Sequence, residues 1–207
     1  MNTDYPTCLS FTLQAEGGFV NNPHDPGGAT MKGITLATFR NFKNDSSLNA
    51  DDLKNITNAE VSAIYSQNYW ATNSCDSLNS GVDLMVFDMD VNAGDSRSAK
   101  LLQAAVGTAT DGAVGPATLA AANSIDSVKL INGLAAHQTA FYQSLSTFQY
   151  FGKGWINRIH ARQAAALSLA ANTTPIPVPM PLPVQPLQPS PVDDPPANFW
   201  SWLAAFI

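Results

Sequence analysis

The chain of 207 residues has little charge, few cysteines and no long apolar run. Only 13% of its residues are charged, and 16 acidic side chains outnumber 10 basic ones. Proteins that bind DNA or RNA usually carry a basic excess, so we expect no nucleic-acid partner. No window reaches the roughly 20 apolar residues that a spanning helix needs, which argues against an integral membrane protein.

The two cysteines, Cys8 and Cys75, are too few for a disulfide framework and form no Cys/His pattern with zinc spacing. The sequence leaves their pairing open, with buried free thiols as the default. We expect no metal site and no organic cofactor. The first residues lack the basic and apolar regions of a cleavable signal peptide, so we expect export by another route.

Proline is concentrated near the end of the sequence. Ten of the 14 prolines lie between Pro175 and Pro196. Proline removes an amide donor and fixes φ, so we predict an extended linker over 173–197. The segment 198–207 is apolar and aromatic but too short to span a bilayer. Three destinations stay open for it: a membrane interface contacted through Phe199–Ile207, a groove in a partner, or the body of this chain.

The body of the chain, up to residue 172, has a mainly α-helical pattern. Thr35 is a predicted helix cap, Thr57 and Glu60 form a capping box, and Pro116 is suited to a first helical position. The glycine-rich run 17–35 has no helical period and predicts a loop or short hairpin. Helices are predicted over residues 7–15, 35–44, 57–70, 81–92, 96–106, from 116, 127–148 and 155–171.

Charge is distributed unevenly along the chain. Residues 1–126 carry 6 basic and 14 acidic side chains, whereas residues 127–172 carry basic ones alone. The basic residues of that second stretch are Lys129, Lys153, Arg158 and Arg162. This pattern fits either a solvated helix face or attraction to a polyanion such as a bacterial envelope.

One glycine-rich segment carries the residue types of glycoside hydrolysis. Glu16 follows an uncharged, largely apolar helix, an environment that raises a carboxyl pKa and keeps a proton available. Asp25 and Thr30 follow in the glycine-rich loop, which can fold back toward Glu16. These three residues would supply a protonated acid, an ionised carboxylate and a hydroxyl that holds a water. The non-catalytic alternative is that Glu16 is a solvated residue at a helix end and that the glycines only shape the loop.

The run from Glu16 to Thr35, EGGFVNNPHDPGGATMKGIT, resembles the signature of glycoside hydrolase family 108 muramidases at every fixed position. Its Glu-x8-Asp spacing also resembles that of phage-type lysozymes, although Thr30 comes one residue earlier than in their pattern. The resemblance implies a lysozyme-like helical fold with a small loop or hairpin lobe at the active site. It implies Glu16 as the general acid, with Asp25 and Thr30 as the carboxylate and the water-positioning hydroxyl. Substrate contacts are expected nearby, at His24, Gly33, Ile34 and Thr35.

Downstream motifs resemble the predicted peptidoglycan-binding region that accompanies this family. They lie at residues 83–94, 102–103, 111–119 and 154–158. We therefore divide the body into a catalytic region, 1–80, and a helical peptidoglycan-binding region, 81–172, packed on it. The glycines and proline of 111–119 are also simply good turn chemistry.

Further candidate substrate-binding residues have competing interpretations. Tyr69 and Trp70, with Tyr65, are either core residues or a platform for sugar stacking. Asn92 and Asp95 either flank a turn at Gly94 or hydrogen-bond glycan. Trp155 is expected to anchor the core, and Arg158 to be a helix-surface charge or a wall contact.

The resemblance implies cleavage of the β-1,4 bond between N-acetylmuramic acid and N-acetylglucosamine. We expect the protein to be a monomer. We expect a phage or prophage endolysin that waits in the host cytoplasm and acts on peptidoglycan in the periplasm. A lytic transglycosylase that uses the same glutamate is one rival. A non-catalytic protein that binds the wall or assists secretion is the other.

Overall fold

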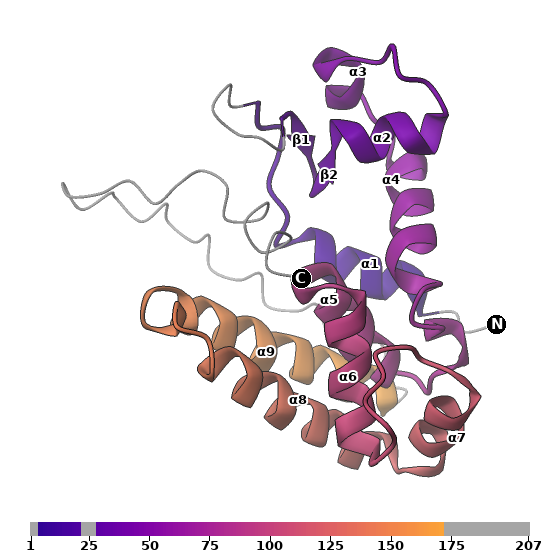
Figure 1. The fold of residues 1–207 in the computed structure, drawn as a ribbon, viewed down its shortest axis with the longest axis vertical. Coiled ribbons are helices and arrows are strands. Elements are labelled where there is room, and N and C mark those ends of the chain that lie inside the picture. Colours follow the sequence, from indigo (N-terminus) through magenta and orange to yellow (C-terminus); the bar gives the residue numbers. More distant parts are fainter. Residues whose placement is uncertain (1–3, 22–27, 172–207) are drawn as a thin grey trace.

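The computed structural model describes residues 4–21 and 28–171, and this part of the chain is mainly helical (Figure 1). Its two short strands are β1 (Thr30–Met31) and β2 (Ile34–Thr35). The α-helices are α1 (Tyr5–Leu13), α2 (Leu36–Lys43), α3 (Ala50–Lys54), α4 (Asn58–Tyr65), α5 (Val82–Ala93), α6 (Asp95–Val106), α7 (Pro116–Ser124), α8 (Ser127–Gln143) and α9 (Phe148–Ala170). A π-helical turn, η1 (Ser66–Trp70), extends α4, and a 3-10 turn, η2 (Cys75–Ser77), precedes α5. The predicted mainly α, lysozyme-like fold is confirmed.

The glycine-rich segment folds into the small hairpin that the sequence predicted. β1 and β2 pair antiparallel, with Thr30 opposite Thr35 and Met31 opposite Ile34. Lys32 and Gly33 form the turn, and both have positive φ (49° and 73°), as tight two-residue hairpins require. Val20 pairs with Thr30 on the other side, so the chain after Glu16 returns along the hairpin.

Most predicted helix starts coincide with observed caps. The Thr35 hydroxyl accepts from the Thr38 amide at the start of α2, and Thr57 with Glu60 forms the capping box of α4. The short α3 was not predicted, although Asn49 and Asp52 cap it in the same way.

The predicted limits of the last two helices were wrong. α8 ends at Gln143, and α9 begins at Phe148, seven residues before the predicted start. The early start of α9 includes Gly152, which lies directly against the Phe148 ring. Packing of that ring over the glycine outweighs the low helix propensity of glycine.

Helix α5 is the centre of the molecule. All of its residues except Val91 are buried, and it contacts α1, α6, α8 and α9. Its Phe87 ring meets Tyr5, Tyr65 and Trp70 edge-on, which joins α1 and α4 to the core. In Figure 1, α1 and α5 lie between the lobe formed by the hairpin with α2–α4 and the part formed by α6–α9.

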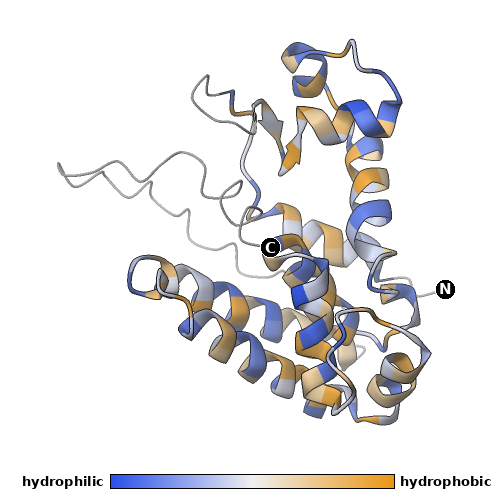
Figure 2. Ribbon diagram, viewed as in Figure 1, coloured by the Kyte–Doolittle hydropathy of each residue, from blue (hydrophilic) through white to orange (hydrophobic). Residues whose placement is uncertain are grey.

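Helices α8 and α9 pack against each other as a long pair. Figure 2 shows polar and apolar residues alternating along both, as expected for helices buried on one face. Arg162 is completely buried and Arg158 is largely buried, whereas Lys129 and Lys153 are exposed. A solvated helix face therefore does not describe all four cations, because two of them pair with a buried acid described below.

Cys8 and Cys75 are both buried free thiols, so the described structure contains no bridge between them. Within residues 4–21 and 28–171, no helix combines the length and the apolar character needed to cross a bilayer. The predicted linker, 173–197, and the apolar segment, 198–207, lie outside the described residues.

Candidate active site

Glu16 lies just beyond the end of α1, where its amide donates to the Leu13 carbonyl. Only 6% of its side chain is exposed. Burial raises the pKa of Glu16, and the nearby Arg158 acts in the opposite direction. The carboxyl environment that the sequence predicted is therefore present, with a cation added to it.

Arg158 connects Glu16 to a second, deeper acid. Its Nη2 lies 4.0 Å from Glu16 Oε1 and 2.6 Å from Asp88 Oδ1. Its Nε donates to Asp88 Oδ2 at 3.1 Å, so the guanidinium binds both carboxylate oxygens of Asp88. The prediction of a helix-surface charge was wrong for Arg158: it forms an ion pair inside the protein.

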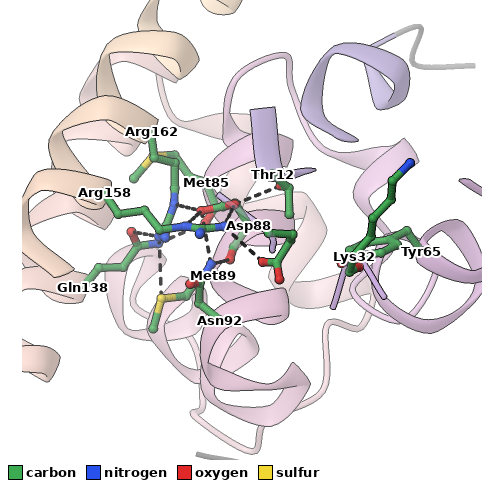
Figure 3. Close-up of polar contacts among 11 residues, drawn as sticks. Thr12, Lys32, Tyr65, Met85, Asp88, Met89, Asn92, Gln138, Arg158 and Arg162 are labelled. Atoms are coloured by element: carbon green, nitrogen blue, oxygen red, sulfur yellow. Dashed lines mark hydrogen bonds and ion pairs between the residues drawn. The ribbon is translucent and has the colours of Figure 1, made fainter. Parts of the chain in front are cut away.

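Asp88 accepts hydrogen bonds from side chains of two other helices, α1 and α9. Besides Arg158, it accepts from Arg162 Nε at 2.6 Å and from the Thr12 hydroxyl at 2.8 Å (Figure 3). Burial works to raise the pKa of Asp88, but the two arginine charges hold it well below its usual range. Arg162 also donates to Gln138 Oε1 at 2.6 Å, so the arginine that binds Asp88 is itself fixed by a second hydrogen bond.

The turn of the hairpin reaches the Glu16 carboxyl from the opposite lobe. A Cβ at Gly33 would lie 2.8 Å from Glu16 Oε2 and 2.6 Å from the Tyr65 hydroxyl oxygen. Together with its positive φ, this close approach leaves room for glycine alone. The Tyr65 hydroxyl donates to the Lys32 carbonyl at 2.9 Å, and Figure 3 shows Tyr65 beside Lys32. Burial, and then the charge of Glu16, raise the pKa of Tyr65, so it stays a donor.

The other predicted residues of the glycine-rich segment have varied positions. Thr30 is part of β1, and its hydroxyl makes a long contact of 3.5 Å with the Gly28 carbonyl. Ile34 is buried in the core, and Thr35 caps α2. The predicted roles of His24 and Asp25 fall on residues outside the described structure.

The two predicted aromatic contacts, Tyr69 and Trp70, are neighbours in the π-helical turn η1 but face different surroundings. Tyr69 is partly buried and lies against Tyr65, with ring centroids 5.3 Å apart. Trp70 is 2% exposed and packs on Tyr5 and Phe87. Trp70 therefore has no open face for a sugar and is a core residue. π-Helical turns often occur at functional sites, and this one brings Tyr69 toward Glu16 and Tyr65.

The remaining candidates are mainly structural in this conformation. The Asn92 amide donates to the Asp88 carbonyl, and Asp95 is an exposed residue that begins α6 after the turn at Gly94. Trp155 stacks on Tyr142 with ring centroids 5.0 Å apart, as expected for a core anchor. Asn92 is therefore committed to the interior, and the turn interpretation fits it better than glycan binding.

The motif at residues 111–119 holds a turn. Gln103 Nε2 donates to Asp111 Oδ1 at 2.6 Å and to the Ala113 carbonyl at 3.0 Å. The Gly112 amide donates back to Gln103 Oε1 at 2.9 Å. These bonds fix the turn between α6 and α7, so this motif has a complete structural explanation.

A second acid of α5, Asp90, has a different environment. It is 1% exposed and accepts from Asn73 Nδ2 at 2.8 Å. Burial raises the pKa of Asp90 to about 7. Within the described structure, the Asn73 amide oxygen is buried and has no hydrogen-bond partner.

Sequence reasoning missed Asp88 and Arg162 as neighbours of the site. A usable signal existed: Arg158 and Arg162 share one helix face at a spacing of four, among apolar residues. A buried helix that carries several acids also requires compensating cations elsewhere in the chain. Among the described residues, no group of His, Cys, Asp or Glu side chains is arranged to hold a metal ion.

Comparison with known proteins defines the class as a glycoside hydrolase with a peptidoglycan-binding region. Residues 9–94 match Glycosyl hydrolase 108, and residues 97–160 match Predicted Peptidoglycan domain. The solved structure of Brucella abortus SagA is similar, with 36% sequence identity and a TM-score of 0.69, over 80% of this chain and 95% of that chain. The chain thus belongs to the glycosyl hydrolase 108 family. The search of curated proteins gave no match.

Proposed function

We propose that this peptidoglycan hydrolase is an N-acetylmuramidase that cleaves the β-1,4 bond between N-acetylmuramic acid and N-acetylglucosamine. The observation that carries the proposal is the Glu16 carboxyl, which is nearly buried and has a raised pKa. A carboxyl with a raised pKa holds its proton more tightly than a solvated one and can deliver it to a leaving group. Family membership supports the same reaction class.

In the proposed mechanism, Glu16 protonates the glycosidic oxygen as the bond breaks. The hairpin turn at Gly33 confines the carboxyl and limits the directions in which it can donate. Asp25 would stabilise the developing oxocarbenium charge or orient water, with help from Thr30. These two roles rest on the sequence signature.

The test is mass spectrometry of fragments released from purified peptidoglycan by wild type and by Glu16→Gln. We expect reducing muramic acid ends from wild type and a loss of at least about 10²-fold in Glu16→Gln, since general acid catalysis contributes that much. Glu60→Gln is a matched control, because Glu60 pairs with Lys43 on the lobe surface. It should retain wild-type activity.

Other outcomes identify the rivals. Anhydro-muramic ends from wild type would make the enzyme a lytic transglycosylase. An absence of fragments from a folded wild type would favour a non-catalytic wall-binding or secretion-assisting protein. Equal activity in Glu16→Gln would reject Glu16 as the acid.

We further propose that the protein is a monomeric phage or prophage endolysin, held in the host cytoplasm and acting in the periplasm on the cell wall. The Glu-x8-Asp spacing shared with phage-type lysozymes supports this role. The apolar segment Phe199–Ile207 would contact the membrane interface, where tryptophan is favoured. Deletion of 173–207 should abolish binding to vesicles of bacterial lipid and leave hydrolysis of purified peptidoglycan unchanged. Vesicle binding that survives the deletion would remove the basis for this membrane contact.

A further inference from the structure

We propose that Asp88 and Arg158 are positioning residues for the general acid: Asp88 fixes and partly neutralises the Arg158 guanidinium, and Arg158 stabilises the Glu16 carboxylate that remains after proton transfer. The inference rests on the proposed function for the catalytic role of Glu16. It adds two residues, one from α5 and one from α9, that act through Glu16.

The geometry fixes Arg158 in one orientation. Its Nε and Nη2 are bound to the two oxygens of Asp88, which is itself held by Arg162 and Thr12. Because Asp88 belongs to the buried helix α5, it holds the Arg158 guanidinium in place and prevents that side chain from rotating away from Glu16. The distance of 4.0 Å between Nη2 and Glu16 Oε1 is longer than a hydrogen bond, so the attraction is electrostatic.

The charges of the cluster explain why both residues are needed. Asp88 carries one negative charge and its two arginines carry two positive charges, so an ionised Glu16 neutralises the group. Without Arg158, burial alone would hold the proton on Glu16 too tightly. Without Asp88, two uncompensated cations would pull the proton off before substrate arrives.

The other groups that face Glu16 are weaker influences. Tyr65 of α4 and Tyr69 of η1 are phenols whose pKa burial raises, so both stay neutral. The turn at Gly33 brings backbone rather than charge. Among the described residues, Arg158 is the ion-pair partner of Glu16.

The experiment follows the Glu16 carboxyl carbon by NMR through a pH titration, with a pH–rate profile beside it. Arg158→Met should raise the Glu16 pKa and Asp88→Asn should lower it, each by at least about one unit, which is tenfold in proton affinity. The basic limb of kcat/KM should move in the same directions. Arg158→Lys should keep the pKa near that of wild type, because it keeps the charge.

Two further variants guard against misfolding and unspecific effects. Asp88→Asn alone leaves two buried arginines uncompensated and can prevent folding. The double variant Asp88→Asn/Arg162→Met restores the net charge of the cluster and should return the Glu16 pKa toward the wild-type value. Lys153→Met removes an exposed cation from α9 and should shift neither the pKa nor the rate.

Shifts of the same sign in Arg158→Met and Asp88→Asn, or no shift in either, would overturn the inference. A double variant whose Glu16 pKa departs from the wild-type value as far as that of Arg158→Met would also overturn it. The NMR titration needs no turnover, so the two proposals can fail separately. Opposite shifts in a protein that releases no fragments would reject the muramidase function alone. Hydrolysis with an unmoved Glu16 pKa would reject the positioning role alone.

Discussion

Two acids on one helix, Asp88 and Asp90, show that burial does not decide whether a carboxyl is charged. Their exposed fractions are 0% and 1%. Asp88 has two arginines, and its pKa lies well below the usual range. Asp90 has one amide donor, and burial raises its pKa to about 7. The partners decide the outcome, because the cost of removing each carboxylate from water is similar.

The environment of Asp90 suits its protonated form. A protonated Asp90 offers a hydroxyl that the orphan Asn73 amide oxygen can accept, while the amide nitrogen continues to donate. Asp88 has no need of a proton, because every partner around it is a donor. On one face of α5, Asp88 is therefore an ionised acid paired with arginines. On the other face, Asp90 is a neutral acid paired with the Asn73 amide.

The largest effect is expected from removing one cation from Asp88. Arg162→Met should lower the free energy of unfolding by about 3–5 kcal/mol, because it leaves a buried carboxylate with part of its compensation gone. Urea denaturation at pH 7 measures this loss. Lys129→Met, on the exposed face of α8, is the control and should change stability by less than about 0.5 kcal/mol. A loss below about 1 kcal/mol in Arg162→Met would show that Arg158 alone suffices.

Asp90→Asn should instead raise the free energy of unfolding. The folded protein binds a proton at Asp90 up to about pH 7, whereas the unfolded chain releases it near pH 4. Wild-type stability therefore falls as pH rises between about 4 and 7, and the loss is complete above that window. Asp90→Asn should match wild type near pH 4 and exceed it by about 2–4 kcal/mol at pH 8. Thermal unfolding across pH measures this, and parallel curves for the two proteins would contradict the neutral-acid interpretation.

Thr12→Val tests the neutral part of the Asp88 cluster. Valine keeps the shape and removes one hydrogen bond to a carboxylate that still has two arginines. We expect a loss of about 1–2 kcal/mol, measured by denaturant titration. A loss as large as that of Arg162→Met would mean that the cluster fails as one unit.

The smallest effect is expected in α9 outside both acid clusters, and it sets the scale for the others. A Cβ at Gly154 would meet no atom within 4 Å, so Gly154→Ala should stabilise the protein by about 0.5–1 kcal/mol. Gly152→Ala is the matched comparison, because its Cβ would lie 2.6 Å from the Phe148 ring. It should destabilise the protein, and two equal melting temperatures would contradict this contrast.

The sequence predicted features that depend on neighbouring residues. The caps at Thr35 and Thr57 follow from local hydrogen bonding, and Pro116 at the start of α7 follows from its fixed φ. The hairpin follows from the glycine-rich run. The buried glutamate was predictable because its flanking helix is uncharged. These signals act over a few residues, so they can be read without knowledge of packing.

The ion pairs of Asp88 were beyond such reasoning. Arg158 lies 70 residues from Asp88. Its spacing of four from Arg162 suggests a shared helix face, but it does not identify the acid that the two arginines meet. The start of α9 was misplaced for a related reason, since the contact between Phe148 and Gly152 outweighs the low propensity of glycine. Tertiary contacts, rather than local preference, settle both features.

The position of α9 has a consequence for how this family can change in evolution. The Glycosyl hydrolase 108 match ends at residue 94, whereas both arginines that serve Asp88 lie on α9, beyond it. A recombination event that exchanged only the chain beyond residue 94 would leave Asp88 buried without its cations and Glu16 without its neighbour. The two regions are therefore expected to be inherited as a unit, and a chimera should retain a folded catalytic half only when the incoming helix carries arginines at both positions.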